Sequence, residues 1–66
     1  MTIADFTLPE IEYFRKNCNF VGLEKDLFEM RVKGVTLDEI AESLNISRDW
    51  AGKLSQKVNR KIIKFL

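Results

Sequence analysis

Two Thr-x-x-Glu sequences constrain the fold of this chain more than any other feature. Thr7 and Glu10 enclose the first, and Thr36 and Glu39 enclose the second. In a capping box of this kind, the two side chains bond backbone N–H groups that a helix leaves unpaired at its start. Pro9 stands in the first turn, where its missing N–H costs nothing. Because apolar and polar residues nowhere alternate over the length of a strand, the sequence predicts an all-α fold.

The helix signals divide one domain, residues 1–66, into four helices. After a lead-in over residues 1–6, we expect a bracing helix at about 8–17 and a supporting helix at about 23–33. Gly34 supplies the left-handed residue that ends the supporting helix. A chain of 66 residues has room for one small domain.

The last two helices form a predicted helix-turn-helix over about residues 37–65. The turn falls at Asn45, because Asn is the non-Gly residue that best tolerates the left-handed conformation. Ser47 caps the long C-terminal helix, which starts at Arg48. A connection of about three residues forces a steep crossing angle, and Ala41 supplies the small side chain needed at the crossing point. The predicted fold is a small four-helix, all-α domain containing a helix-turn-helix with a long C-terminal recognition helix.

Apolar residues three or four positions apart predict the buried face of each helix. Cys18 is expected to be a small core residue rather than a reactive thiol. The expected buried stripes are Leu8, Ile11, Phe14 and Cys18; Leu23, Leu27 and Met30; Ile40, Ala41 and Leu44; and Ala51, Leu54, Val58, Ile62 and Phe65.

The composition argues against several classes of function. The chain has no His, which removes the commonest general base and zinc ligand. Its one Cys cannot form an internal disulfide or a multi-cysteine metal site, and it fits a reducing cytoplasm. No apolar run reaches the roughly 20 residues of a membrane span. We therefore expect a cytoplasmic protein that is not an enzyme, holds no metal or cofactor and has no membrane partner.

The net charge of +1 conceals an asymmetry along the chain. Residues 1–47 carry five basic and nine acidic side chains, a net charge of −4, whereas residues 48–66 carry six basic and one acidic side chain, a net charge of +5. A basic segment on a near-neutral body is typical of proteins that contact phosphates. The alternative is a solvated helix face with cations near its C-terminus, where the helix dipole favours them.

The stretches LEKDLFEMRVKG and VTLDEIAESLNIS, followed by the basic helix ending NRKIIKFL, carry a family resemblance. The segment from Leu23 to Leu66 resembles the helix-turn-helix of LuxR-type response-regulator output domains, and it is equally similar to the promoter-reading helix-turn-helix of sigma-factor region 4. The resemblance covers about two-thirds of the chain and leaves out the first helix. It implies that the helix starting at Arg48 enters the DNA major groove.

Carried over position by position, the resemblance implies two sets of DNA contacts. Lys53 can donate to guanine, Gln56 can pair with adenine, and Asp49 can accept from cytosine. An ordinary solvated side chain is the alternative for each. The expected base contacts are Arg48, Asp49, Gly52, Lys53 and Gln56, and the expected phosphate contacts are Ser47, Lys57, Arg60 and Lys61.

Two positions depart from the family pattern. Trp50 stands where the family usually has a small polar residue, and Gly52 stands where a polar or basic residue is common. Gly52 either permits close approach of another backbone or reflects drift at an exposed site. Trp50 either folds back on the second helix, lies against a deoxyribose or thymine methyl, or anchors a protein interface.

The C-terminal end is too apolar for a single buried stripe. Ile63 and Leu66 point away from that stripe, so we expect them to meet Tyr13 and Phe20 or a second copy of the chain in a homodimer.

Two functions from different classes follow from these features. The leading hypothesis is a sequence-specific DNA-binding transcriptional regulator of bacterial or phage type, whose partner is double-stranded DNA. The alternative is a protein-interaction adaptor on the same scaffold, which binds RNA polymerase, a sigma factor or another regulator through Trp50 and the acidic first half of the chain. The candidate protein-interface residues are Trp50, Ile63 and Leu66.

Overall fold

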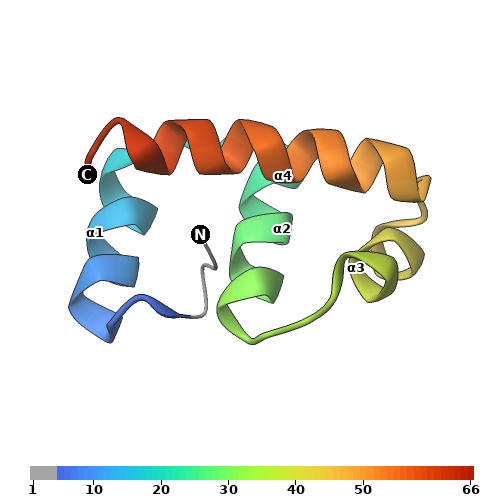
Figure 1. Ribbon diagram of the computed structural model, residues 1–66, viewed down its shortest axis with the longest axis horizontal. Coiled ribbons are helices and arrows are strands. Elements are labelled where there is room, and N and C mark those ends of the chain that lie inside the picture. The colour runs from blue at the N-terminus through green and yellow to red at the C-terminus, as the bar shows by residue number, and fades with distance from the viewer. Residues whose placement is uncertain (1–4) are drawn as a thin grey trace.

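The computed structural model describes residues 5–66, so the first four residues of the predicted lead-in lie outside the described part. It contains α1 (Leu8–Asn17), α2 (Leu23–Val32), α3 (Leu37–Leu44) and α4 (Arg48–Ile63), with no strand among the described residues. Figure 1 shows α4 running along the long axis of the molecule, with α1 at its C-terminal end, α2 at its middle and α3 at its N-terminal end. The all-α class is confirmed, and the helix ends lie within two residues of their predicted positions.

Side-chain caps start three of the helices. The Glu10 carboxylate accepts a hydrogen bond from the Thr7 N–H at 2.8 Å, as a capping box requires. The Thr36 hydroxyl oxygen accepts from the Glu39 N–H at 3.2 Å. Ser47 caps α4 through its hydroxyl oxygen, which accepts from the backbone N–H of the third helical residue at 3.1 Å. These predicted caps are confirmed.

Left-handed residues end α2 and α3. Gly34 has a φ of 82° and Asn45 has a φ of 57°, both as predicted. After Asn45 the Ile46 N–H donates to the Ala41 carbonyl at 2.9 Å, which satisfies a carbonyl that the helix would otherwise leave unpaired. The connection between α3 and α4 is therefore a tight turn of three residues, in which the N–H groups of Asn45 and Ile46 donate to carbonyls of α3.

The core lies where α2 meets the other helices. Phe28 and Leu27 of α2 are completely buried, together with Ile40 of α3 and the α4 residues Val58 and Ile62. From α1, the core takes three further side chains, Ile11, Phe14 and Cys18. α4 packs against both α2 and α3 and so ties the small domain together.

Two residues of the predicted buried stripes are exposed instead. Leu8 is 67% exposed because it lies in the first turn of α1, beyond the residues that reach the core. Phe65 follows the end of α4 and is 42% exposed, because the chain has left the helical register that would continue the buried stripe. Its ring meets the Tyr13 ring edge to face at 5.7 Å. Phe65 thus makes a contact with Tyr13 of the kind that was predicted for Ile63 and Leu66.

Phe20, the other aromatic residue predicted to meet the C-terminal end, packs against Phe28, with ring centroids 4.6 Å apart. Phe20, a residue of the loop between α1 and α2, therefore packs against the core. No helix within residues 5–66 combines the length and the apolar character that crossing a membrane requires.

Candidate nucleic-acid interface

One face of α4 is exposed along the helix, directly opposite the side that it buries. An α-helix turns about 100° per residue, so residues three or four apart share a face. The buried stripe consists of Ala51, Leu54, Val58 and Ile62. The exposed residues that lie opposite, here called the outer ridge, are Asp49, Lys53, Gln56 and Arg60. The outer ridge brings together three of the predicted base contacts and one predicted phosphate contact.

The basic residues near the outer ridge are not neutralised by the protein. The ion pairs among residues 5–66 join Arg15 to Glu29, Arg48 to Asp38 and Lys61 to Glu24. Four cations of α4 and its C-terminal cap take part in none of them, namely Lys53, Lys57, Arg60 and Lys64. All four are exposed. They are therefore available to an anionic partner without loss of an internal contact.

Ser47 and the first turn of α4 add backbone donors at one end of the outer ridge. The Ser47 hydroxyl is exposed and serves as the cap of α4. The N–H groups of Arg48 and Asp49 belong to the first helical turn, where no carbonyl of the same helix can accept from them. Such a helix start attracts anions through its donors and its dipole. Within the first turn, Asp49 complements the same dipole.

Arg48 is turned toward α3. Its Nε donates to Asp38 Oδ1 at 2.8 Å, and its guanidinium lies beside Gly52, where Nη1 is 3.6 Å from the position that a Cβ atom would take. The Arg48 and Asp38 side chains are 54% and 83% exposed. A pair so exposed contributes little free energy, so another anion can compete for Arg48.

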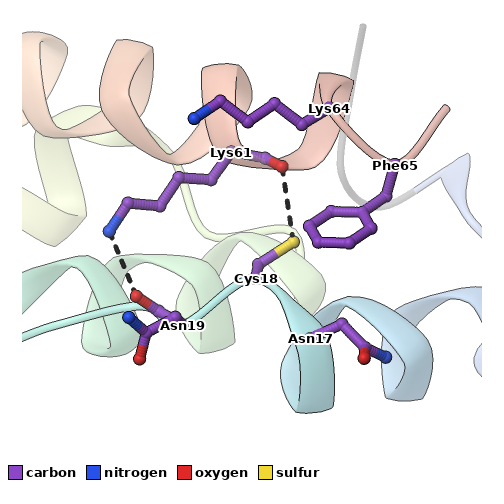
Figure 2. A pocket seen from close by; sticks show the side chains of 6 residues that line it. All are labelled: Asn17, Cys18, Asn19, Lys61, Lys64 and Phe65. Carbon is purple, nitrogen blue, oxygen red and sulfur yellow. Dashed lines mark hydrogen bonds between the residues drawn. The ribbon is translucent and has the colours of Figure 1, made fainter.

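Lys61 is directed away from the exposed face of α4. Figure 2 shows its side chain reaching from α4 to the loop after α1, where Nζ donates to the Asn19 carbonyl at 3.1 Å. The same ammonium forms a hydrogen-bonded ion pair with Glu24. The Lys61 carbonyl also accepts from the Cys18 thiol at 3.6 Å. Lys61 thus joins α4 to α2, and the phosphate contact predicted for it would require this pair to break.

Glu24 is the structural partner of Lys61, and the sequence analysis did not predict this pair. It is 7% exposed and shares the buried face of α2 with Leu27 and Phe28, three and four residues further on. That spacing was the available signal, because a carboxylate on a buried helix face needs a cation. The hydrogen bond from Lys61 holds the pKa of Glu24 below its ordinary value. Burial acts in the opposite direction and is outweighed.

Cys18 is buried, as predicted, at the junction of α1 and α4. Loss of hydration raises the pKa of its thiol, and the nearby Lys61 opposes this only in part. A buried thiol with a raised pKa is unreactive, which agrees with the predicted core role.

Exposed apolar side chains gather at the C-terminal end of the molecule, far from Trp50. Ile63 and Leu66 are 58% and 70% exposed, and the ring pair of Tyr13 and Phe65 lies at the same end. Trp50 is 50% exposed in the first turn of α4 and does not pack against the core cluster. The half-exposed indole therefore gives no support to the interpretation that Trp50 folds back onto α2 as peripheral core.

The exposed face of α4 offers several kinds of hydrogen-bond donor. Donors of several kinds, ammonium, guanidinium, amide and backbone N–H, occupy an exposed helix face of about 24 Å, the length of a 16-residue helix. No group of three potential metal ligands occurs within residues 5–66. No protein-family model, curated protein or solved structure matches the chain.

Proposed function

We propose that this protein is a sequence-specific DNA-binding transcriptional regulator of bacterial or phage type, which inserts α4 into the major groove. The observation that carries the proposal is the outer ridge of α4, with its exposed, unpaired cations opposite the buried stripe. An α-helix fits the major groove of B-DNA, where each base pair presents a distinct pattern of donors and acceptors. The protein acts by binding, in the cytoplasm, and carries out no catalysis.

The geometry of α3 and α4 supports a helix-turn-helix. Three residues connect the two helices, and the left-handed Asn45 makes so short a connection possible. Ala41 of α3 and Ala51 of α4 are both buried, which suits two helices that pack closely together. α2 supports both helices from behind and leaves the outer ridge open.

Base reading is assigned to the half of α4 that starts at Arg48. Lys53 can donate to guanine O6 and N7, Gln56 can bond adenine N6 and N7, and Asp49 can accept from cytosine N4. Arg48 reaches guanine once a phosphate or base replaces Asp38, at little cost because that pair is exposed. Gly52 has no side chain and lets the helix backbone approach the base edges.

Phosphate contacts are assigned to the flanks and the far end of α4. Ser47 and the first-turn N–H groups can bind one phosphate, and Lys57 and Arg60 can bind others further along the helix. With about three such contacts, the logarithm of the binding constant falls by roughly 2 to 3 per tenfold increase in salt.

The test is selection of bound sites from random duplex DNA, followed by titration of a labelled site at two salt concentrations. Lys53→Ala is expected to weaken binding by about 1–3 kcal/mol and to relax the sequence preference at one position. Arg60→Ala is expected to weaken binding to all duplexes alike and to lower the salt slope by about 1. The control is Lys16→Ala, which removes an exposed lysine from α1.

Duplex binding that is absent even at low salt would contradict the proposal. If Lys53→Ala and Arg60→Ala both match the Lys16→Ala control, the outer ridge is not the DNA-binding face. The symmetry of the selected site also reports whether one or two copies of the chain bind.

A second candidate function rests on the apolar C-terminal end. Ile63, Phe65 and Leu66 expose apolar side chains beside Tyr13, and such a patch can pack against another protein. The protein that binds this patch would be RNA polymerase, a sigma factor, another regulator or a second copy of the chain. Ile63→Asp with Leu66→Asp would then abolish complex formation in analytical ultracentrifugation while DNA affinity for a single site persists.

A further inference from the structure

Trp50 is a large apolar side chain placed among charges. Its indole is 50% exposed in the first turn of α4. Asp49 precedes it, Lys53 lies one turn further along the helix surface, and Lys57 lies two turns along, all of them exposed. Neither lysine is held by an ion pair among the described residues.

The surroundings of Trp50 do not fit the anchor of a protein interface. Such anchors sit in the middle of an apolar patch that excludes water. The exposed apolar residues Ile63, Phe65 and Leu66 lie at the opposite end of α4, and the first of them is about 20 Å away along the helix axis. A lone exposed indole beside unpaired cations fits a ligand that combines negative charge with an apolar surface.

The position of Trp50 around the helix places it on one flank. It is rotated by about 60° from Lys53 on the outer ridge and by only about 20° from Lys57, a predicted phosphate contact. With the outer ridge over the base edges, the indole lies on the same flank of the helix as Lys57 and about 10 Å nearer its start, so it faces the side of the groove rather than its floor. In the major groove, the C5 positions of the pyrimidines lie in that region, between the floor of the groove and the sugar-phosphate wall.

We propose that Trp50 reads pyrimidine C5-methyl groups in the major groove, so that the protein binds thymine and 5-methylcytosine in preference to uracil and unmethylated cytosine. The proposal rests on the proposed duplex-DNA function, and it adds which bases the site prefers, namely pyrimidines that carry a C5-methyl group. The methyl group is the one apolar feature of the major-groove edge, and apolar side chains read it by contact. An indole offers a large and rigid apolar surface for that contact.

The test compares duplexes that differ only in the methyl group. Alternating dA·dT is paired with alternating dA·dU, and alternating dG·dC with its 5-methylcytosine form, all of equal length. Burial of one methyl group increases affinity by roughly fourfold, so the wild-type protein is expected to bind the methylated member of each pair more tightly by about that factor. The chain contains one Trp, so its fluorescence reports directly whether the indole meets the DNA.

Three variants connect the methyl preference to the side chain. Trp50→Ala is expected to bind both members of each pair equally, whereas Trp50→Phe keeps part of the preference. Tyr13→Ala, which removes an exposed ring at the other end of the molecule, is expected to keep all of it. The methyl group also changes DNA shape, which can alter affinity without any contact to Trp50. The decisive quantity is therefore the affinity ratio between methylated and unmethylated duplexes in the wild type, compared with the same ratio in Trp50→Ala.

The outcomes separate this proposal from the proposed function. Absence of binding to all four duplexes at low salt overturns both. Duplex binding with no methyl preference, or with a preference that Trp50→Ala retains, overturns the methyl-reading proposal alone. Binding to single-stranded dT as tight as to duplex, with loss of Trp fluorescence, identifies base stacking and also overturns it. If Trp50→Ala fails to fold, the wild-type and Trp50→Phe titrations decide.

Discussion

At the scale of single residues, Asn45 decides how α3 and α4 are joined. Its φ of 57° lies in the left-handed region, where an L-residue other than Asn or Asp meets a steric cost. Its N–H donates to the Glu42 carbonyl at 3.2 Å, so the turn is bonded as well as tight. The direction in which α4 leaves α3 therefore depends on one backbone conformation.

Substitution of Asn45 tests this dependence. Asn45→Gly is expected to leave the free energy of unfolding nearly unchanged, because Gly adopts the left-handed conformation freely. Asn45→Val is expected to lower it by about 1–2 kcal/mol, since a β-branched side chain is strained there. Urea denaturation measures both, and equal stabilities of the two variants would show that the turn does not require the left-handed residue.

At the scale of the helix, α4 is long, and only one narrow stripe of it is buried. Apart from Trp50, Gly52 and Ile63, the remaining faces carry polar and charged side chains, so the core constrains the sequence of α4 at one position in every three or four. Gly52 is unusual in this setting. A Gly within a helix costs about 1 kcal/mol relative to Ala, and a Cβ added at Gly52 would meet only the Arg48 Nη1, at 3.6 Å.

Gly52→Ala is therefore expected to stabilise the protein. The expected gain is about 0.5–1 kcal/mol in the free energy of unfolding, which raises the melting temperature by roughly 2–8 °C in a domain of this size. Thermal denaturation followed by circular dichroism measures it. A lower melting temperature would show that the space beside Gly52 is needed for the fold, and a DNA titration of the same variant shows whether it is needed for binding.

At the scale of the whole molecule, folding brings some basic residues of the C-terminal segment next to acidic residues that lie far away in the sequence. Two of the basic side chains of α4, Arg48 and Lys61, are paired with acidic residues of α3 and α2. The pairing turns these cations toward the body of the protein and leaves four others exposed, Lys53, Lys57, Arg60 and Lys64. The positive surface is therefore narrower than the basic segment of the sequence.

The ion pair of Glu24 and Lys61 makes the free energy of unfolding depend on pH in the acidic range. The pKa of Glu24 is lowered in the folded state, mainly by the hydrogen bond from Lys61. The Glu24 carboxylate therefore takes up a proton more readily in the unfolded chain than in the folded protein. The stabilisation is complete above the ordinary Glu pKa, and it is lost as the pH falls through the lower pKa that Glu24 has in the folded protein. We expect the free energy of unfolding to fall between about pH 5 and pH 3, in the range of the ordinary Glu pKa and below it.

Glu24→Gln is expected to flatten this acid dependence and to lower stability at neutral pH by about 1–3 kcal/mol, because Lys61 loses its charged partner. Glu42→Gln is the matched control, since Glu42 is exposed and forms none of the ion pairs. Urea denaturation at a series of pH values measures the effect. The lowered pKa of Glu29, which is due first to its hydrogen bond with Arg15, leaves a residual acid dependence in the variant. An unchanged pH profile in Glu24→Gln would show that the pair contributes nothing.

The local structure of this protein is readable from its sequence because the decisive interactions are local. Caps at Thr7, Thr36 and Ser47 and left-handed ends at Gly34 and Asn45 each involve residues within about five positions of one another. The outer ridge is equally predictable, since helical periodicity alone places Lys53 and Arg60 opposite the buried stripe.

What the tertiary structure alone decided concerns residues that are far apart in the chain. Lys61 meets the requirements for a phosphate contact by position and charge, yet it pairs with Glu24, 37 residues away. Phe65 fits the spacing of the buried stripe, yet it lies beyond the end of α4 and meets Tyr13. Periodicity identifies a helix face, but it cannot identify which distant segment covers that face. The sequence thus determines by itself the helices and the ridge that α4 exposes, whereas the packing of α2 and α3 against α4 decides which cations remain free on it.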